Sequence, residues 1–251
     1  MMSVRSKVLV MTRSETSALQ PCFILHTRKY RDTSALVEVF SREAGRYTLV
    51  ARGARSKNNR YGNCLQLFVP LLIASVGQGE LKTARNMENN GAPYRLYGPG
   101  LIIGMYVNEL LYRLLGKFDP YTALYDRYET LLNALQSESF DTSMLRDFEL
   151  SLLSDLGYGI SFDVEAQTGD PISRDQRYHF VVEDGFHYLP DNDSTRRALE
   201  GEHILNIADG KLDATADQIA KWVIRQSINQ LLGGRILNSR MYFSHRVHHP
   251  S

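Results

Sequence analysis

The residues with the clearest chemical meaning stand in one basic stretch, Gly45–Lys57. It begins as alternating strand sequence, with Tyr47 and Leu49 two positions apart, and breaks at Gly53 into a polar loop. This loop concentrates four cations, Arg52, Arg55, Lys57 and Arg60. Cations gathered in this way are too costly to bury together, so they face either water or a polyanion. The stretch predicts a phosphate-binding loop, and a merely solvated loop is the alternative.

The distribution of charge along the chain supports a polyanionic partner, although the net charge of +1 says little by itself. Residues 1–98 hold 15 Lys and Arg against 6 Asp and Glu, a net charge of +9. Residues 99–251 hold 14 against 22, a net charge of −8. This asymmetry is expected where one half of a protein meets nucleic acid and the other half folds or binds elsewhere.

Aromatic residues are interleaved with the cations of the basic half. Bases can stack on tyrosine rings while cations follow the phosphate backbone, a combination typical of sequence-neutral binding to single strands. The candidate stacking residues are Tyr30, Tyr47 and Tyr61. The supporting cations are Arg28, Lys29, Arg31, Arg46, Lys82 and Arg85. Each tyrosine taken singly fits equally well as a cap on the core of the domain.

The sequence does not predict catalytic machinery, a metal site or a cofactor. It has no P-loop, no G-x-S-x-G and no H-E-x-x-H motif. Its two cysteines, Cys22 and Cys64, are far from a CxxC spacing, which fits a reducing cytoplasm. His179 and His187 could flank a metal, but no third ligand stands at a sensible spacing, so surface histidines of a hairpin are favoured. We therefore expect no enzyme, and a metal-dependent nuclease is disfavoured with the rest.

The first half of the chain reads as strands after a flexible lead-in over residues 1–20. The predicted strands are 22–26, 35–40, 46–51, 67–76 and 80–85. Five short strands suit a small barrel of the OB type over residues 21–96, a fold that carries single-stranded nucleic acid. Pro70 falls within the fourth predicted strand and must then sit at a bulge or an edge.

The second half, residues 97–251, changes to helical spacing. Helices are predicted from about Tyr97, from Asp119-Pro120, from Asp141-Thr142, over 217–231 and over 236–243. An insertion at about 160–193 contains a β-hairpin that turns at residues 183–185. The longest apolar run, 101–107, is well short of the roughly 20 residues that a membrane span needs. The predicted fold is thus α+β, an N-terminal five-stranded OB-fold barrel followed by a mainly α-helical domain.

Several segments, in order along the chain, carry a family likeness: Phe23–Arg28, Thr33–Phe40, Gly45–Lys57, Gly79–Thr83, Tyr106–Leu111, Phe148–Leu150 and Leu156–Gly159. They closely resemble the RecO family of bacterial recombination mediators, over a range that runs from about Phe23 to Gly234. Many members of that family carry a four-cysteine zinc site in the second domain. This chain has no cysteine in 160–193, so it resembles the zinc-free branch.

The resemblance implies recombinational DNA repair in the cytoplasm, in association with the nucleoid. It implies binding to single- and double-stranded DNA, annealing of complementary strands and, with the partner RecR, help for RecA in displacing the single-stranded-DNA-binding protein. The family's basic loop maps to Arg52, Arg55, Lys57 and Arg60 of this chain. The competing hypothesis is an OB-fold RNA-binding or assembly module without annealing activity.

The resemblance also implies a groove in the helical domain for the acidic, apolar C-terminal tail of the single-stranded-DNA-binding protein. The segment that suggests it contains Arg146, Phe148 and Leu150. Arg146 is a candidate clamp for the tail carboxylate, because a guanidinium can pair with a carboxylate in a bidentate fork. The alternative for Arg146 is an ordinary helix arginine that pairs with Glu149 or Glu138.

Overall fold

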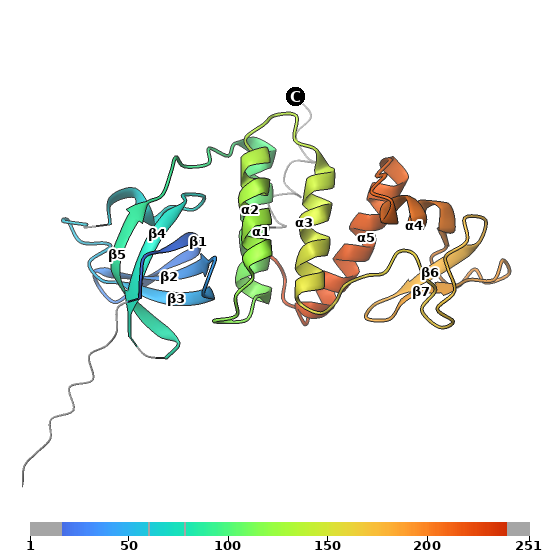
Figure 1. The fold of residues 1–251 in the computed structure, drawn as a ribbon, viewed down its shortest axis with the longest axis horizontal. Coiled ribbons are helices and arrows are strands. Elements are labelled where there is room, and N and C mark those ends of the chain that lie inside the picture. The colour runs from blue at the N-terminus through green and yellow to red at the C-terminus, as the bar shows by residue number, and fades with distance from the viewer. Residues whose placement is uncertain (1–16, 60, 78, 240–251) are drawn as a thin grey trace, which may run out of the picture.

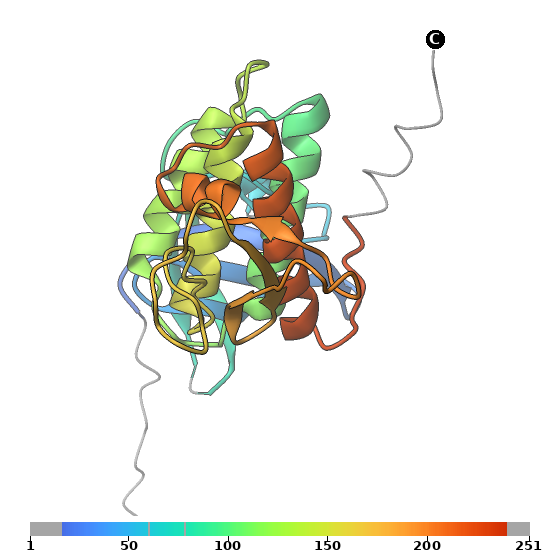
Figure 2. The same cartoon turned by 90° about the vertical axis from the view of Figure 1, so that its right-hand side faces the viewer.

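A computed structural model describes residues 17–59, 61–77 and 79–239 of the chain. The molecule is elongated, with a β-barrel at one end, helices in the middle and a small sheet at the other end (Figure 1). Figure 2 looks along this axis from the end that carries the small sheet. The predicted order of a barrel followed by a helical domain is confirmed.

Five strands form the barrel: β1 (Gln20–Tyr30), β2 (Ser34–Ser41), β3 (Gly45–Ala51), β4 (Leu71–Val76) and β5 (Leu81–Asn89). A short 3₁₀ helix, η1 (Gly62–Leu65), lies between β3 and β4. The strands are ordered β1-β2-β3-β5-β4, and β4 pairs with β1 to close the barrel. Only the β3–β5 pair is parallel among these neighbours. This arrangement is the predicted OB fold.

The ends of three strands differ from the sequence prediction, and β1 and β5 run further than predicted, to Tyr30 and Asn89. The fourth strand begins at Leu71 instead of residue 67, so Pro70 precedes the strand and needs no bulge. The first strand begins at Gln20, and Ser17 donates its backbone N–H to the Ser75 carbonyl at 2.8 Å. Residues 17–20 are therefore held against the barrel, which corrects that part of the predicted lead-in; residues 1–16 lie outside the described residues.

The second half contains five helices among the described residues: α1 (Gly98–Leu114), α2 (Thr122–Ala134), α3 (Thr142–Asp155), α4 (Gly201–Ala208) and α5 (Ala214–Leu231). Asp141 caps α3 by accepting a hydrogen bond from the Ser143 N–H, and Asp213 caps α5 in the same way through Thr215 and Ala216. The α3 start is thus as predicted, and α5 begins three residues earlier than predicted.

The insertion contains the predicted hairpin, formed by β6 (Arg177–Val181) and β7 (Gly185–Tyr188). A two-residue strand, β8 (Leu199–Glu200), joins β6 and leads into α4, and neither was predicted. The prediction of a last helix over 236–243 is wrong for its described part, because residues 236–239 are not helical. Its remaining residues lie outside the described part of the chain.

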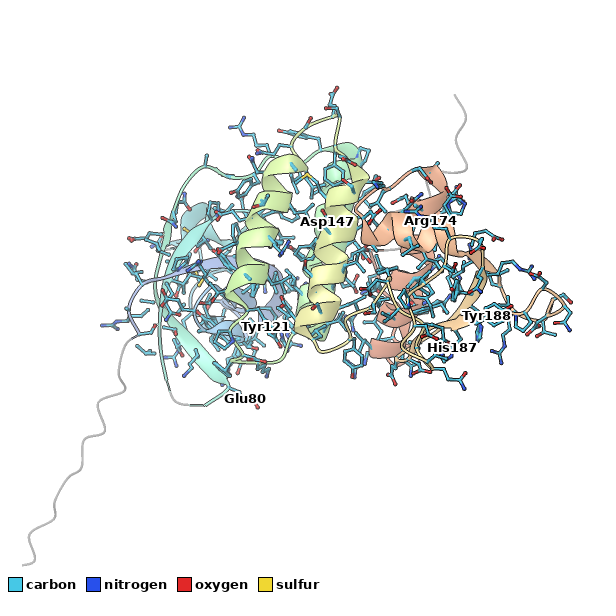
Figure 3. All side chains as sticks on the ribbon, turned by 45° about the vertical axis from the view of Figure 1, so that its right-hand side comes forward. Glu80, Tyr121, Asp147, Arg174, His187 and Tyr188 are labelled. Carbon is cyan, nitrogen blue, oxygen red and sulfur yellow. The ribbon has the colours of Figure 1, made fainter. Side chains whose placement is uncertain are left out.

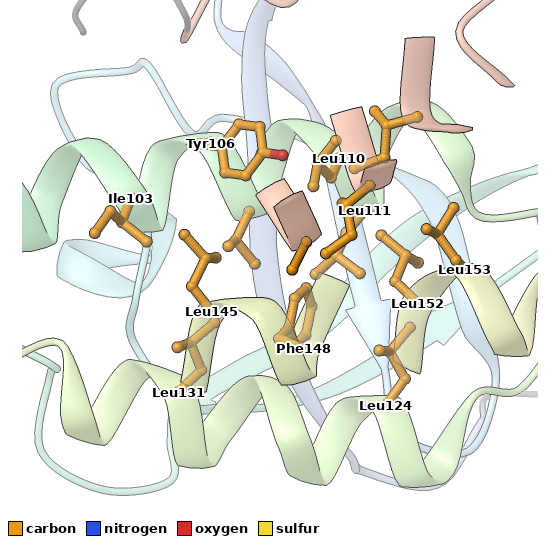
Figure 4. Packing of buried hydrophobic residues seen from close by; sticks show 14 of the residues in the cluster. Ile103, Tyr106, Leu110, Leu111, Leu124, Leu131, Leu145, Phe148, Leu152 and Leu153 are labelled. Carbon is orange, nitrogen blue, oxygen red and sulfur yellow. The ribbon is translucent and has the colours of Figure 1, made fainter. Parts of the chain in front are cut away.

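Two separate hydrophobic cores support the two domains. Inward-facing strand residues such as Ile24, Val37 and Leu49 fill the barrel. A second core runs through the helices to the hairpin, and it also includes three outward-facing barrel residues, Phe23, Leu25 and Phe40. Figure 4 shows how side chains from α1, α2 and α3 converge in this second core. The helical domain therefore packs directly against one end of the barrel's outer face.

A polar junction accompanies this packing where the end of α1 meets β2 and β3. Arg46 donates one hydrogen bond to Glu38 at 3.0 Å and another to the Leu115 carbonyl at 2.9 Å. Thr48 donates to the other Glu38 oxygen at 3.0 Å. Gly45 has a φ of +68°, and a Cβ placed there would lie 1.9 Å from the Asp119 carbonyl oxygen. The β2–β3 turn thus contacts the α1–α2 loop at a distance that only glycine allows.

Replacing Gly45 with alanine should therefore lower the free energy of unfolding by about 2–5 kcal/mol, since left-handed strain and a backbone clash add together. Gly53→Ala is the matched control. Gly53 also has a positive φ of +74°, but its nearest contact would be the Ser56 hydroxyl at 3.7 Å. Gly53→Ala should therefore lower the free energy of unfolding by only about 1–2 kcal/mol. Chemical denaturation measures both variants, and equal losses would contradict the close approach.

Candidate nucleic-acid interface

An open groove of about 490 Å³ lies on the outer face of the barrel. It forms at the Tyr30 end of β1, away from the Phe23 end that packs against the helices. Strand pairing assembles it, because Tyr30 pairs with Ser34 across β1–β2 and Val50 pairs with Thr83 across β3–β5. We call it the barrel groove. Its lining residues are Tyr30, Arg31, Thr33, Ser34, Val50, Arg52, Gly53, Leu81 and Thr83.

The predicted phosphate-binding loop leaves β3 beside this groove, and we call residues 52–57 the basic arm. The arm is fixed at its base, because Arg55 donates its backbone N–H to the Thr33 carbonyl of the β1–β2 turn at 2.8 Å. Ser56 closes a tight turn onto the Gly53 carbonyl through its N–H at 3.1 Å and its hydroxyl at 2.8 Å. The arm therefore presents its cations from a turn that backbone hydrogen bonds hold against the barrel.

Six of the predicted cations are exposed around the groove and the arm: Arg28, Lys29, Arg31, Arg52, Arg55 and Lys57. None of them makes an ion pair within the described residues. Arg31 lies over the Tyr30 ring, with 5.2 Å between its guanidinium carbon and the ring centre. The structure thus gathers at one end of the barrel the cations that the sequence places on either side of β2.

Four other predicted DNA-binding cations have different surroundings. Arg46 is a correction, because its side chain is only 12% exposed and is held by Glu38 and Leu115 at the domain junction. Lys82 is half-buried and donates to the Gly77 carbonyl at 2.9 Å, so it supports the β4–β5 turn. Arg85 is exposed on β5. Arg60 lies outside the described residues.

Two of the three candidate stacking tyrosines are core residues. Tyr47 and Tyr61 are each 3% exposed and belong to the barrel core. Burial raises the pKa of Tyr47 far above its ordinary value. Tyr61 donates its hydroxyl to the Ala84 carbonyl at 3.5 Å. Their assignment to base stacking is therefore corrected, and Tyr30 is left as the accessible ring of the set.

The predicted tail clamp Arg146 is also corrected, because the side chain is buried in an internal ion pair. It contacts Glu149 one turn along α3 and donates to Asp217 of α5 at 3.1 Å. Tyr106 of α1 donates its hydroxyl to the same Glu149 at 2.6 Å. Burial raises the pKa of the Glu149 carboxyl, while Arg146 and Tyr106 act in the opposite direction. This cluster ties three helices together and leaves no free fork for a ligand carboxylate.

The structure offers a different groove nearby, of about 300 Å³ between α2 and α3. Leu131, Met144 and Phe148 provide its apolar lining, and Phe148 is 1% exposed at its base. Arg127 and Asp147 are exposed at its rim, and Figure 3 labels Asp147 on α3. We call this the α2–α3 groove. The predicted Leu150 is half-buried and does not line it.

Arg127 was missed because its segment, Asp126-Arg127-Tyr128, looks like an ordinary helix face in the sequence. A usable signal was its position three residues after Leu124 and one before Tyr128, which places it beside the apolar stripe of α2. Its neighbour Asp126 is neutralised by Arg42, which donates to both carboxylate oxygens at 2.8 and 2.9 Å.

The two predicted hairpin histidines are neighbours across β6 and β7, with 5.4 Å between their ring centres. His187 contacts Asp184 at 2.7 Å, and His179 contacts Arg196. Within the described residues no group of three or more His, Cys, Asp and Glu side chains is placed to hold a metal ion. The helices of the same described part are all too short or too polar to cross a membrane.

A closed OB barrel joined to a helical domain places the protein in the OB-fold class, many of whose members bind nucleic acid. Comparison with known families makes this more specific. The family model described as "Recombination protein O N terminal" matches residues 15–90, and the model described as "Recombination protein O C terminal" matches residues 99–241.

Full-length relatives agree with these models. The DNA repair protein RecO of Coxiella burnetii is 37% identical over 224 residues, which cover 89% of this chain and 96% of the relative. The protein of the same name from Aromatoleum aromaticum is 37% identical over 231 residues, 92% of this chain and 96% of the relative. The DNA repair protein RecO of Cellvibrio japonicus is 38% identical over 227 residues, which cover 90% of this chain and 96% of the relative. The chain belongs to the RecO family of DNA repair proteins.

The buried cluster generates a prediction about stability. Arg146→Met leaves Glu149 buried without its cation, and we expect the free energy of unfolding to fall by about 3–5 kcal/mol. A carboxyl with a raised folded-state pKa contributes stability below its unfolded pKa and loses it as pH rises through the folded value. The deficit of the variant should therefore be larger in mildly alkaline than in mildly acidic buffer, as measured by chemical denaturation.

The matched control is the double variant Arg146→Met, Glu149→Leu, which removes the unpaired charge and should recover most of the lost stability. A single variant that unfolds like the unmodified protein yet loses affinity for an acidic tail would reinstate Arg146 as the clamp.

Proposed function

We propose that this RecO-family protein binds single- and double-stranded DNA and anneals complementary strands. With RecR, it promotes the loading of RecA onto DNA coated by the single-stranded-DNA-binding protein. The observation that carries the proposal is the set of six exposed cations at the Tyr30 end of the barrel, where Arg31 and Arg52 line the barrel groove. The other four are Arg28 and Lys29 on β1 and Arg55 and Lys57 on the basic arm. The protein acts here by binding alone, so the proposal assigns no catalytic residue and no cofactor.

The physical basis of annealing is charge neutralisation on two strands. Each strand repels its complement through its phosphates, and exposed arginine and lysine side chains lower that repulsion when they displace condensed counterions. The barrel groove and the basic arm provide such side chains without a fixed set of hydrogen bonds to base edges. Binding of this kind is independent of sequence, as annealing of arbitrary repair intermediates requires.

The α2–α3 groove is the proposed site for the tail of the single-stranded-DNA-binding protein. The apolar lining of Leu131, Met144 and Phe148 suits the apolar residues of such a tail. At the rim Arg127 attracts a tail carboxylate, whereas Asp147 repels one, so the carboxylate is placed on the Arg127 side. Docking there would tether the barrel to coated DNA and make the second contact effectively intramolecular. RecR and RecA remain proposed partners on the basis of family membership.

The cationic groove predicts the salt dependence of DNA binding. The logarithm of the affinity for a single strand should fall against the logarithm of salt concentration with a slope of about −0.7 per phosphate contacted. The double variant Arg55→Ala, Lys57→Ala should bind more weakly, and its slope should be shallower by about 0.7 for each phosphate that the variant side chains no longer reach. Fluorescence anisotropy titrations over a range of salt concentrations give both quantities.

Lys211→Ala is the control for this titration, because Lys211 is exposed but pairs with Asp209 in the helical domain. It should leave affinity and slope unchanged. Binding that is insensitive to salt, or an equal change in both variants, would refute phosphate contact by the basic arm.

The tethering hypothesis is tested by annealing complementary oligonucleotides coated with the single-stranded-DNA-binding protein, without ATP or metal. Annealing should be fast on the intact coat and collapse on a coat that lacks its acidic tail. Arg127→Ala should weaken binding of the isolated tail peptide by about tenfold, the loss expected for one charge-assisted contact. Arg174→Ala is the control, since this exposed arginine lies beside Asp209, away from the groove (Figure 3).

Annealing that is indifferent to the tail would retain the barrel and reject the α2–α3 groove. A protein that anneals neither coated nor bare strands but binds folded RNA would be the OB-fold RNA-binding or assembly module instead.

A further inference from the structure

The interior of the barrel groove is suited to an uncharged ligand group. Two of its lining residues, Arg31 and Arg52, are cations. Between the strands the groove is lined by Val50, Leu81 and Thr83. Leu81 is 47% exposed, so an apolar side chain faces solvent inside a cationic surface. The described lining contains no carboxylate. A phosphate would gain nothing from the apolar part, whereas a flat, partly apolar group would be desolvated against it.

Tyr30 provides an aromatic face at the rim of this groove. Its ring is half-buried, in contrast to Tyr47 and Tyr61, which the barrel core encloses. The cation–π contact with Arg31 orients the ring, and Arg31 itself has a left-handed backbone with a φ of +52°. A turn of this conformation holds the cation next to the aromatic ring. Because Arg31 lies over the ring, a stacking base takes its place on that face, and the displaced guanidinium contacts the neighbouring phosphate.

The polar groups inside the groove favour no particular base. Thr33, Ser34 and Thr83 contribute hydroxyls, and a hydroxyl can either donate or accept a hydrogen bond by rotation. Amide side chains, which present a fixed donor and acceptor pattern, are absent from the described lining. A groove of about 490 Å³ also lies within the range of about 300–1,000 Å³ found for small-molecule sites, so a nucleobase fits.

We propose that the barrel groove is a base-binding site that accepts only an unpaired nucleotide, so that base pairing itself releases the strand from the groove. This inference rests on the proposed function and specifies how the same site treats substrate and product. A paired base has its edge engaged and both faces stacked within the duplex, so it cannot stack on Tyr30. The basic arm contacts phosphates, which a duplex presents as well as a single strand does.

The consequence is a direction for annealing. A single strand is held by the groove and the arm together, whereas the duplex product is held by the arm alone. Each new base pair removes a base contact, so the product is bound more weakly than the reactant strand. The protein thereby releases what it has annealed without an external energy source.

The test uses the full-length protein and three fluorescent probes with equal numbers of phosphates: a thymidine oligonucleotide, the same backbone with abasic sites, and a hairpin duplex. Anisotropy titrations should show the thymidine strand bound about tenfold more tightly than the abasic strand, the factor expected for a stacked base. Tyr30→Ala should abolish this preference and change the affinity for the abasic strand and the duplex by less than about twofold.

Two further variants separate the base contact from other effects. Tyr30→Phe keeps the ring and should retain the preference, while the unchanged affinity of Tyr30→Ala for the abasic strand and the duplex shows that the alanine variant is folded. Lys57→Ala should weaken binding of all three probes by the same factor, because it acts on phosphates. A preference that survives Tyr30→Ala, or an alanine variant that weakens all three probes equally, would overturn the inference.

The outcomes also separate this inference from the proposed function. An unmodified protein that binds none of the three probes overturns both. An unmodified protein that anneals bare strands but binds the abasic and thymidine strands equally overturns the base site alone.

Discussion

The Glu38 carboxylate at the domain junction fixes which part of the barrel is covered and which is open. It is only 7% exposed, and it is stabilised by Arg46 and Thr48. Arg46 extends the connection to the Leu115 carbonyl at the end of α1. A buried carboxylate is tolerated only while its partners stay in place, so β3 and α1 are held in one arrangement. The helices consequently cover the Phe23 end of β1, and the Tyr30 end faces solvent with its cations.

Most of the regular elements were predictable because their signals are local, although α4 and β8 were not. Alternation identified the strands, and helical spacing identified α1, α2, α3 and most of α5. The surroundings of individual side chains were not predictable, because they depend on contacts between distant residues. Arg46 and Arg52 look alike in the sequence, yet a carboxylate eight residues before Arg46 draws it into the junction. Tyr47 and Tyr30 differ only in which face of a strand they occupy, and a bulge in β1 between residues 24 and 26 shifts that alternation.

The same reason explains the error in the helical domain. Arg146 stands in a segment that resembles a family motif, but its partner Asp217 lies 71 residues further along the chain. No local pattern connects the two positions, whereas the closer partner, Glu149, was recognisable as an alternative one turn away. Arg127 shows the converse case, because only the packing of α2 against α3 creates the groove beside it. The separation of charge between the two halves was visible in the sequence. In the structure the basic half forms the barrel, and the acidic half forms the helical domain.

The barrel and the helices are distinct in topology, but the core of the helical domain extends onto the outer face of the barrel. The side chains of Phe23, Leu25 and Phe40 point outward from the barrel strands. They belong to the helical core, which extends as far as the hairpin. Tyr128 of α2 lies edge-on to Phe23, with ring centres 5.1 Å apart, and donates its hydroxyl to Asn108 of α1. A barrel expressed without the helices would expose these aromatic and aliphatic side chains to water as one hydrophobic patch, which favours aggregation. The two halves should therefore melt in a single cooperative step, and the smallest unit that can be dissected for study is nearly the whole chain.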